Sequence, residues 1–297
     1  MTENDTFAFD PEGNAASALG FFAVGVHAGF RADPERLDMA LVVADEPCAA
    51  AATFTTNVFC AAPVRVSREH LNEGGAGAPA YGCARAVVVN SGIANAATGE
   101  IGLENARKTA ELVGEAVGCP ADEVLVASTG VIGQHLRLEP FAEGVPAALA
   151  AMAKVADDLA GRTSQGATAA RAIMTTDTVK KELAVETVIG GKTVRMGGIA
   201  KGSGMIHPNM GTMLCGITTD CAIDGALLQD MLRQVVTKTF NRITVDGDTS
   251  TNDMVVVLAN GMAENAVIEH EGPDYDAFCA ALAQVTRALC RLIAADG

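Results

Sequence analysis

Short apolar runs alternate with amphipathic stretches along most of this sequence of 297 residues. Four runs are short, rich in valine and bounded by turn residues, which is typical of buried strands. They are residues 39–44, 84–89, 124–127 and 254–258. Because strands and helices that alternate along a chain usually share a core, the pattern predicts a protein of the α/β or α+β class.

Three stretches carry apolar residues at helical spacing, with charged residues between them. The first stripe consists of Leu103, Ala106, Ala110, Val113 and Val117. Gly118-Cys119-Pro120 follows this stripe and is predicted to end the helix. Similar stripes run through residues 228–236 and 278–292, and we interpret all three as faces that pack in a core. Residues 72–79 and 188–193 are rich in glycine and are predicted to be connectors.

Composition narrows the classes of function. Acidic residues outnumber basic ones 36 to 21, giving a formal charge of −15, which disfavours nucleic acid and anionic lipid as partners. The first ten residues contain acids where a signal peptide needs a basic start, and no run has the roughly 18–20 apolar residues of a membrane span. The eight cysteines and five histidines lack the spacing of a metal site. We expect a cytoplasmic protein without a metal.

Five segments combine Gly, Ser, Thr, Asn and Asp more densely than ordinary core does. They are residues 89–96, 127–133, 173–178, 198–220 and 240–252. Each one alone is explained by a turn whose polar side chains satisfy nearby backbone groups. Together, and flanked by apolar residues, they predict one polar site where the segments converge, because such groups are costly to bury without partners.

Parts of this sequence resemble well-known motifs, but the spacing of their residues does not match. Gly191-Lys192-Thr193 resembles the end of a phosphate loop, but Glu186 stands where the upstream glycine is needed. Asp246 and Asp248 resemble the start of a calcium loop, but Thr251 stands where that loop has glycine. No serine lies in a G-x-S-x-G elbow. Cys215 and Cys221 are weak nucleophile candidates, because apolar neighbours raise the pKa of a thiol.

Thr212 is the better candidate for a nucleophile. A threonine that becomes a chain N-terminus carries its own base, since a free α-amine has a pKa of roughly 7.7–8.0. Gly211 precedes it, and without a Cβ this residue leaves room for the Thr212 hydroxyl to approach the Gly211 carbonyl. The pair therefore permits self-cleavage.

The order and wording of the motifs resemble the glutamate N-acetyltransferase (ornithine acetyltransferase) family of arginine biosynthesis. The resemblance rests on NSGIANAATG, ASTGVIG, IMTTDT, KGSGMIHPNMGTML and FNRITVDGDTSTND. It implies an αββα sandwich of two sheets between helices and self-cleavage between Gly211 and Thr212. It also implies an α chain of residues 1–211 and a β chain of residues 212–297, with two of each in a heterotetramer. Alanine is more usual than glycine before the cut.

The same resemblance implies residue roles. Thr212 would accept an acetyl group from N2-acetyl-L-ornithine and pass it to L-glutamate, while Thr129 and Gly130 stabilise the oxyanion. Thr175, Lys201 and Thr212 would contact the substrate, the lysine suiting an amino-acid carboxylate. The resemblance implies no metal or organic cofactor, and it leaves acetyl-CoA open as a second donor.

The family pattern continues as D-G-E-G, whose glutamate binds substrate, whereas this sequence stops at Asp296-Gly297. We therefore expect a chain that is C-terminally incomplete relative to the family and a poor catalyst by itself. Two alternatives remain open. One is an N-terminal-threonine amidase or aminopeptidase, in which water removes the acyl group, and the other is an inactive truncated homologue.

Overall fold

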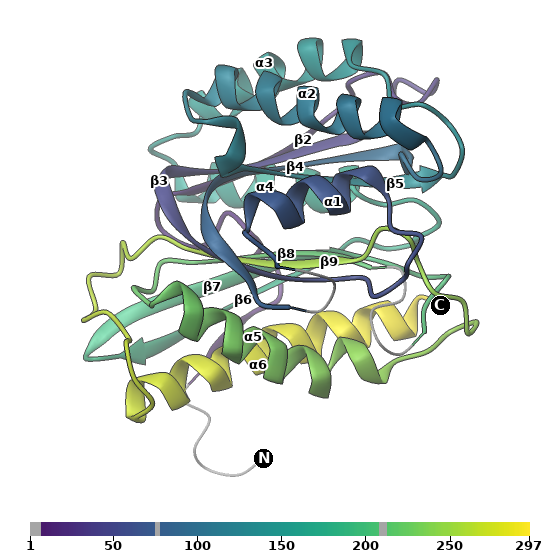
Figure 1. Cartoon of the computed structure of the whole chain (residues 1–297). Helices are drawn as coiled ribbons and strands as arrows, with labels where there is room; N and C mark the ends of the chain where they lie inside the picture. The colour runs from purple at the N-terminus through teal and green to yellow at the C-terminus, as the bar shows by residue number, and fades with distance from the viewer. Residues whose placement is uncertain (1–6, 75–77, 208–212) are drawn as a thin grey trace.

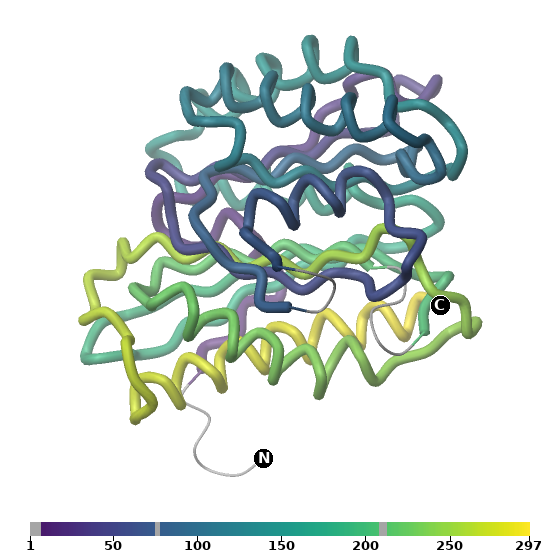
Figure 2. Tube along the Cα trace, in the orientation of Figure 1, coloured from purple at the N-terminus to yellow at the C-terminus, as the bar shows by residue number. Residues whose placement is uncertain are grey.

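The computed structural model describes residues 7–74, 78–207 and 213–297 (Figures 1 and 2). The strands are β1 (Ala8–Asp10), β2 (Phe21–Val26), β3 (Met39–Phe54), β4 (Ala80–Ile93), β5 (Val124–Val131), β6 (Lys181–Ile189), β7 (Lys192–Lys201), β8 (Leu214–Thr219) and β9 (Met254–Ala259). The helices are α1 (Ala62–His70), α2 (Gly99–Val117), α3 (Glu139–Ala153), α4 (Leu159–Ala172), α5 (Gly225–Lys238) and α6 (Pro273–Ala295), with short 3₁₀ turns η1 (Ala121–Glu123) and η2 (Phe240–Arg242).

Hydrogen bonds join the strands of the described residues in the order β1-β6-β7-β8-β9-β3-β4-β5, and β2 pairs with β3. The 16-residue strand β3 links two halves of this network. Its first part pairs with β2 and its last part, Ala49–Phe54, pairs with β9, while an irregularity between Val43 and Cys48 changes its register with β4. The pairs β4–β5 and β8–β9 are parallel, and the others are antiparallel. The long strands thus fold one network into two stacked sheets.

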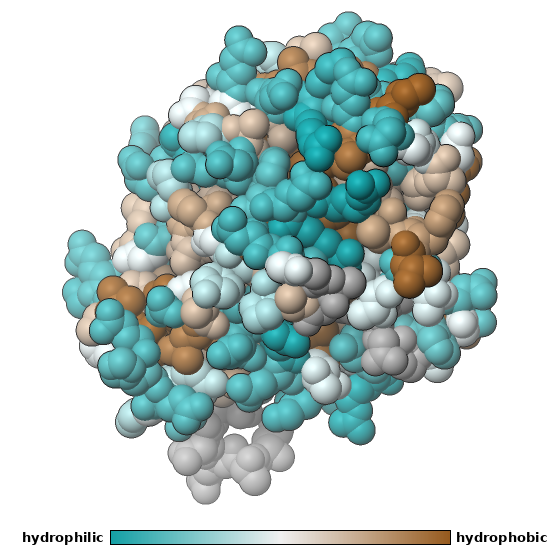
Figure 3. Space-filling model, viewed as in Figure 1, coloured by the Kyte–Doolittle hydropathy of each residue, from teal (hydrophilic) through white to brown (hydrophobic). Residues whose placement is uncertain are grey.

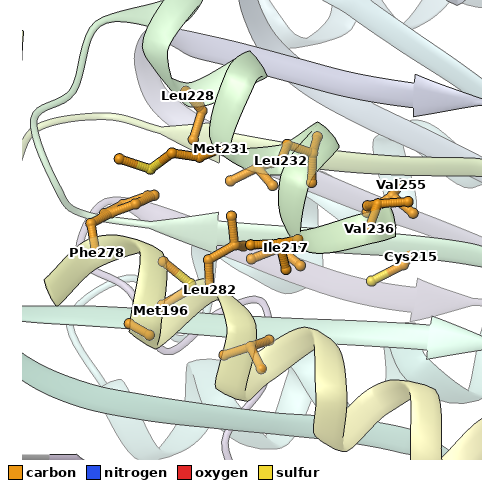
Figure 4. Close-up of a cluster of buried hydrophobic side chains, with 14 of the residues drawn as sticks. Met196, Cys215, Ile217, Leu228, Met231, Leu232, Val236, Val255, Phe278 and Leu282 are labelled. Atoms are coloured by element: carbon orange, nitrogen blue, oxygen red, sulfur yellow. The ribbon is translucent and has the colours of Figure 1, made fainter. Parts of the chain in front are cut away.

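Three separate hydrophobic clusters show that the molecule has four layers. The first cluster lies between β2–β5 and the helices α2 and α3, and the second lies between the two sheets, where α4 contributes Ala169, Ala170 and Ala172. The third packs β6–β9 against α5 and α6, with Met231, Leu232, Phe278 and Leu282 among its side chains (Figures 1 and 4). This is the αββα arrangement that the resemblance implied, and it is confirmed.

The predicted strands and helices are present, but their lengths and one connector differ from expectation. Helix α2 ends at the predicted stop, where Gly118 takes a left-handed φ of 79°. Residues 188–193, predicted to be a connector, are instead mostly strand. Only Gly190 and Gly191 turn, with φ of 56° and 76°, and the residues on either side of them continue β6 and β7 into a hairpin. Leu292, assigned to a core face, is 37% exposed, and Ile293 is buried instead.

Helix α6 is long and apolar enough to cross a membrane by length and composition alone. In the structure, its apolar face packs on β6 and β7, and Phe278, Leu282 and Leu289 are fully buried. That packing is typical of a core helix rather than a membrane span. The face of the molecule seen in Figure 3 is largely hydrophilic, with apolar residues in scattered patches.

Candidate functional site

All five polar segments meet at one open cavity of about 1120 Å³, counting the space at its mouth. Its lining consists of Arg31, Gly92, Ala94, Thr129, Gly130, Val131, Ile132, Thr175, Thr176, Lys201, Gly204, Met205, Asp246, Asp248, Ser250, Thr251 and Asn252. The convergence predicted from the sequence is therefore present. Each segment reaches the cavity from the end of a strand or from the loop beside one, so the buried sheets hold the polar residues in place.

The strand registers bring both sheets to this cavity at the same edge. In one sheet, Ser91 near the end of β4 pairs with Thr129 near the end of β5. In the other, Lys201 at the end of β7 pairs with Leu214 at the start of β8, and Leu214 pairs with Met254 at the start of β9. Polar ends of one sheet consequently face polar ends of the other across the cavity.

Lys201 spans the gap between the sheets. Its Nζ donates a hydrogen bond of 3.3 Å to the Thr129 hydroxyl, although the two residues are 72 positions apart. The side chain is almost completely buried, and this burial lowers the pKa of its ammonium. The carboxylates of Asp177 and Asp253 oppose the shift by attracting the positive charge. Burial around Lys201 thus disfavours its charged form, and the nearby carboxylates favour that form.

Asp177 organises the lysine side of the cavity. Its Oδ1 accepts hydrogen bonds from Gly202 N at 2.6 Å and from Lys181 Nζ at 2.8 Å, and its Oδ2 accepts one from Thr175 N at 3.0 Å. Lys201 Nζ lies 4.0 Å from Oδ2. Burial alone would raise the pKa of Asp177, but the two lysines and the two backbone N–H groups together lower it below its ordinary value. Asp177 therefore stays ionised and fixes Thr175 beside Lys201.

Gly130 is a glycine for two reasons that the geometry shows. Its φ of 133° lies in a region that residues with a side chain rarely adopt. A Cβ built at this position would also lie 2.2 Å from the backbone carbon of Gly92 in the neighbouring strand. Glycine thus lets β4 and β5 approach closely where they reach the cavity.

The loop of residues 243–253, which precedes β9, closes the other side of the cavity. Asn252 Nδ2 donates to the carbonyls of Ala94 at 2.7 Å and Ser128 at 2.8 Å, which ties the loop to the ends of β4 and β5. The next residue, Asp253, is fully buried and accepts a hydrogen bond of 2.7 Å from Met213 N. Burial raises the pKa of Asp253 to about 7. The loop therefore binds Met213 through Asp253 and the ends of β4 and β5 through the adjacent Asn252.

The structure brings together four of the six residues predicted for the site. Thr129, Gly130, Thr175 and Lys201 all line the cavity. Gly211 and Thr212 lie outside the described residues, which resume at Met213. The roles assigned to these six residues stay predictions.

Sequence reasoning missed two charged residues, Arg31 and Asp253. Arg31 lines the cavity and donates hydrogen bonds to Ser91 Oγ at 3.4 Å and to the Met174 carbonyl at 3.2 Å. No motif surrounds it, so only the fold reveals its position. Asp253 is the last residue of the quoted motif FNRITVDGDTSTND, but no role was assigned to it; its signal was an acid between a polar loop and a buried strand.

Cys215 and Cys221, weak nucleophile candidates from the sequence, are both buried. Desolvation raises the pKa of each thiol, that of Cys221 to about 12. A thiol in such surroundings is a poor nucleophile, as the apolar sequence around it suggested.

The known proteins that this chain resembles include members of one family. The model of the ArgJ family matches residues 22–297. The arginine biosynthesis bifunctional protein ArgJ of a Synechococcus species is 46% identical over 285 residues, which cover 96% of this chain and 65% of that protein. The protein of the same name from Lactococcus lactis is 46% identical over 286 residues, covering 96% and 67%. The chain thus spans about two thirds of the length of these relatives.

Two solved structures resemble the fold described above. ArgJ of Bacillus halodurans has a TM-score of 0.58 and 35% identity, covering 70% of this chain and 97% of that chain. An ornithine acetyltransferase of Mycobacterium tuberculosis, solved with ornithine, has a TM-score of 0.57 and 34% identity, covering 70% and 100%. With the family match over nearly the whole sequence, these similarities show that the chain belongs to the ArgJ family.

Proposed function

We propose that this chain transfers an acetyl group from N2-acetyl-L-ornithine to L-glutamate, through an acetyl ester on Thr212, as a step of arginine biosynthesis. Thr212 becomes reactive after the chain cuts itself between Gly211 and Thr212, leaving an α chain of residues 1–211 and a β chain of residues 212–297. The freed amine of Thr212 then acts as the base for its hydroxyl.

One observation carries the proposal: Thr129, Gly130, Thr175 and Lys201 line a single cavity, and Met213 is hydrogen-bonded to Asp253 at the end of the loop that lines its other side. Acyl transfer needs a nucleophile next to donors that stabilise the developing oxyanion. Thr129 with Gly130 supplies a hydroxyl and a backbone N–H for that purpose. Met213, which directly follows Thr212 in the chain, is bound by the loop that lines this cavity, and this supports Thr212 as the nucleophile.

The charges of the lining suit the proposed substrates. Lys201 and Arg31 are cations that can attract the α-carboxylate shared by N-acetylornithine and glutamate. The exposed Asp246 and Asp248 provide negative charge that can attract the side-chain ammonium of ornithine. The ornithine bound to the Mycobacterium tuberculosis enzyme agrees with such a substrate for a relative of similar fold.

The coverage of the solved structures supports cleavage at the proposed position. The two solved chains are matched over 97% and 100% of their lengths, yet they cover only 70% of this chain. Residues 1–211 form nearly the same share of the 297-residue sequence. Chains of that length are what a cut before Thr212 would produce.

The test follows the acetyl group through cleavage and then transfer. Mass spectrometry of the purified protein should show fragments 1–211 and 212–297, and N-acetylornithine should add one acetyl group to the second fragment. Glutamate should then remove that group as N-acetylglutamate. Thr212→Ala should stay whole and take up no acetyl. A folded wild-type chain that stays intact, or an acetyl group on another residue, would sink the proposal.

The runner-up is an N-terminal-threonine amidase with the same nucleophile. In that case water would remove the acetyl group as acetate at the same rate with or without glutamate. Complementation of an arginine auxotroph separates the transferase from both the amidase and an inactive homologue. The proposal also includes the use of acetyl-CoA as a second acetyl donor, a heterotetramer of two α and two β chains, and a cytoplasmic location. Each of these needs a test of its own.

A further inference from the structure

Four charged groups form a row from the cavity to the end of α6, with signs that alternate: Lys201, Asp177, Lys181 and Asp296. Lys201 lines the cavity, whereas Lys181 and Asp296 do not. Lys181 is the first residue of β6, and Asp296 directly follows α6. Any influence of Lys181 or Asp296 on the cavity therefore passes through Asp177.

The ammonium group of Lys181 is fully buried and has one acceptor for each of its three N–H donors. Nζ donates hydrogen bonds to Asp177 Oδ1 at 2.8 Å, to Asp296 Oδ2 at 2.6 Å and to the Val179 carbonyl at 3.2 Å. Turning away from these acceptors would leave a buried charge without its partners, which is costly. Lys181 is therefore fixed against one oxygen of Asp177.

Asp296 holds the far end of the row. Its carboxylate accepts hydrogen bonds from Thr178 N at 3.0 Å and from the Thr178 hydroxyl, as well as from Lys181. Burial alone would raise the pKa of Asp296, but the hydrogen bonds from Lys181 and Thr178 lower it to about 2. Asp296 is therefore ionised at neutral pH, and its charge balances that of Lys181.

The two oxygens of Asp177 face different lysines. Lys181 binds Oδ1, while Lys201 Nζ lies 4.0 Å from Oδ2. That separation is longer than a hydrogen bond, whereas the 3.3 Å between Lys201 Nζ and the Thr129 hydroxyl is within hydrogen-bond distance. Lys201 thus stays near the carboxylate of Asp177 without closing on it.

Stability alone does not explain this buried row of charges. Removing charged groups from water is costly, and apolar side chains of similar volume often stabilise a fold as well as a buried ion pair does. Two lysines that share one carboxylate have another consequence, because each cation reduces the attraction that the other feels. The position of Lys201 then depends on the presence of Lys181.

We propose that Lys181 is a positioning residue for the site. By binding Oδ1 of Asp177, it keeps Lys201 from closing on that carboxylate, so that Lys201 stays available to Thr129 and to a substrate carboxylate. Asp296 fixes Lys181 in turn. This inference rests on the proposed function, because it takes Lys201 as a substrate contact.

The proposal predicts two effects of replacing Lys181. Burial lowers the pKa of Lys201, Asp177 and Asp253 raise it, and Lys181 and Arg31 lower it. Without Lys181, one repulsion is lost and Lys201 can approach Asp177, and both changes raise the pKa of Lys201. The same movement withdraws Lys201 from the substrate. A general loosening of the fold would weaken binding without raising that pKa.

The test compares Lys181→Met, which keeps much of the side-chain volume, with the wild-type chain. NMR of ¹³C-labelled lysine side chains gives the pKa of Lys201, whose signal is identified by its absence in Lys201→Met. This pKa should be higher in Lys181→Met. Ornithine has the α-carboxylate but no acetyl group to donate, so calorimetry can measure its Kd. At a pH below both midpoints, the Kd should rise by about 10-fold to 100-fold, the effect of losing one hydrogen bond between charged groups.

Lys180→Met is the matched control. Lys180 is the preceding residue, and it pairs with Glu182 and with Glu12 at 3.9 Å rather than with Asp177. This variant should leave the Lys201 pKa and the Kd of ornithine unchanged. A Lys201 pKa that stays constant or falls in Lys181→Met, or an equal rise of Kd in Lys180→Met, would overturn the proposal.

Asp296→Asn provides a second variant that keeps the shape of the side chain and all of Lys181. It removes the charge that balances Lys181, so the positive charge near Lys201 increases and the pKa of Lys201 should fall. An unchanged or higher pKa would contradict the proposal even if Lys181→Met does not fold. If ornithine does not bind the wild-type chain, the proposed function fails instead, whatever the NMR titrations show.

Discussion

At the scale of single residues, the contact between Lys201 and Thr129 links the two sheets at the cavity. A buried lysine is costly unless its charge is paired, and here Asp177 supplies the opposite charge at 4.0 Å. Lys181, itself fully buried, binds the other oxygen of Asp177 and also Asp296 at 2.6 Å. Alternating charges thus extend from the cavity to the end of α6, and each group depends on its neighbours.

The first prediction concerns Thr129. If its hydroxyl stabilises the oxyanion, Thr129→Ala should slow acetylation of the 212–297 fragment by about 100-fold to 1,000-fold, the usual cost of losing one such donor. Affinity for N-acetylornithine should change little. Rapid-mixing mass spectrometry gives the rate, and an unchanged rate would remove Thr129 from the site.

The second prediction concerns pH. Burial lowers the pKa of Lys201, so the ammonium loses its proton at a lower pH than a free lysine does. Binding of a substrate carboxylate should therefore weaken as pH rises through that lowered pKa. Asp177→Asn removes an attraction that favours the charged form and should move the weakening to lower pH. The Kd of N-acetylornithine, measured against pH for both proteins, tests this, and a shift to higher pH would contradict it.

At the scale of elements, β7 and β8 contain glycines with opposite surroundings. Gly216 lies in the middle of β8 and borders a small apolar cavity between the sheets, and a Cβ added there would meet nothing within 4 Å. Gly197 of β7 pairs with Thr218 of β8, and a Cβ added there would lie 1.9 Å from the Asn14 carbonyl oxygen. The same substitution should therefore have opposite effects on the two strands.

The third prediction uses this pair. Gly216→Ala should raise the free energy of unfolding by about 0.4–1 kcal/mol, because alanine reduces the freedom of the unfolded chain without a clash. Gly197→Ala should lower it by about 1–3 kcal/mol, the usual cost of forcing extra volume into a packed core. Urea denaturation measures both changes. A loss of stability in Gly216→Ala would show that the space is not available.

At the scale of the whole molecule, the proposed cut falls between strands that are paired with each other. Strand β7, before the cut, is hydrogen-bonded to β8 after it, and the last part of β3 is hydrogen-bonded to β9. Helices α5 and α6 also cover the sheet that β6 and β7 contribute to. The two proposed chains therefore share one hydrophobic core and two pairs of hydrogen-bonded strands.

The fourth prediction follows from these ladders. After cleavage, fragments 1–211 and 212–297 should elute together in size-exclusion chromatography and separate only in denaturant, because parting them would expose the shared core. The uncut Thr212→Ala protein should elute at the same volume. A 212–297 fragment that elutes alone under native conditions would contradict the shared fold.

The sequence by itself determined the elements and the chemistry that they carry. Apolar spacing identified the helical faces of α2 and α5, and dense polar segments predicted a converging site, because periodicity and turn chemistry are local properties. The roles of Thr129, Gly130, Thr175 and Lys201 came from the resemblance to a known family. Only the tertiary structure decided how β3 joins two sheets and that Lys201 is buried against Thr129. It also showed that Arg31 lines the cavity and that Asp253 binds Met213 at the end of the loop that closes it. Those contacts join residues far apart in sequence, and burial and pKa depend on what packs around a group, which no local pattern specifies.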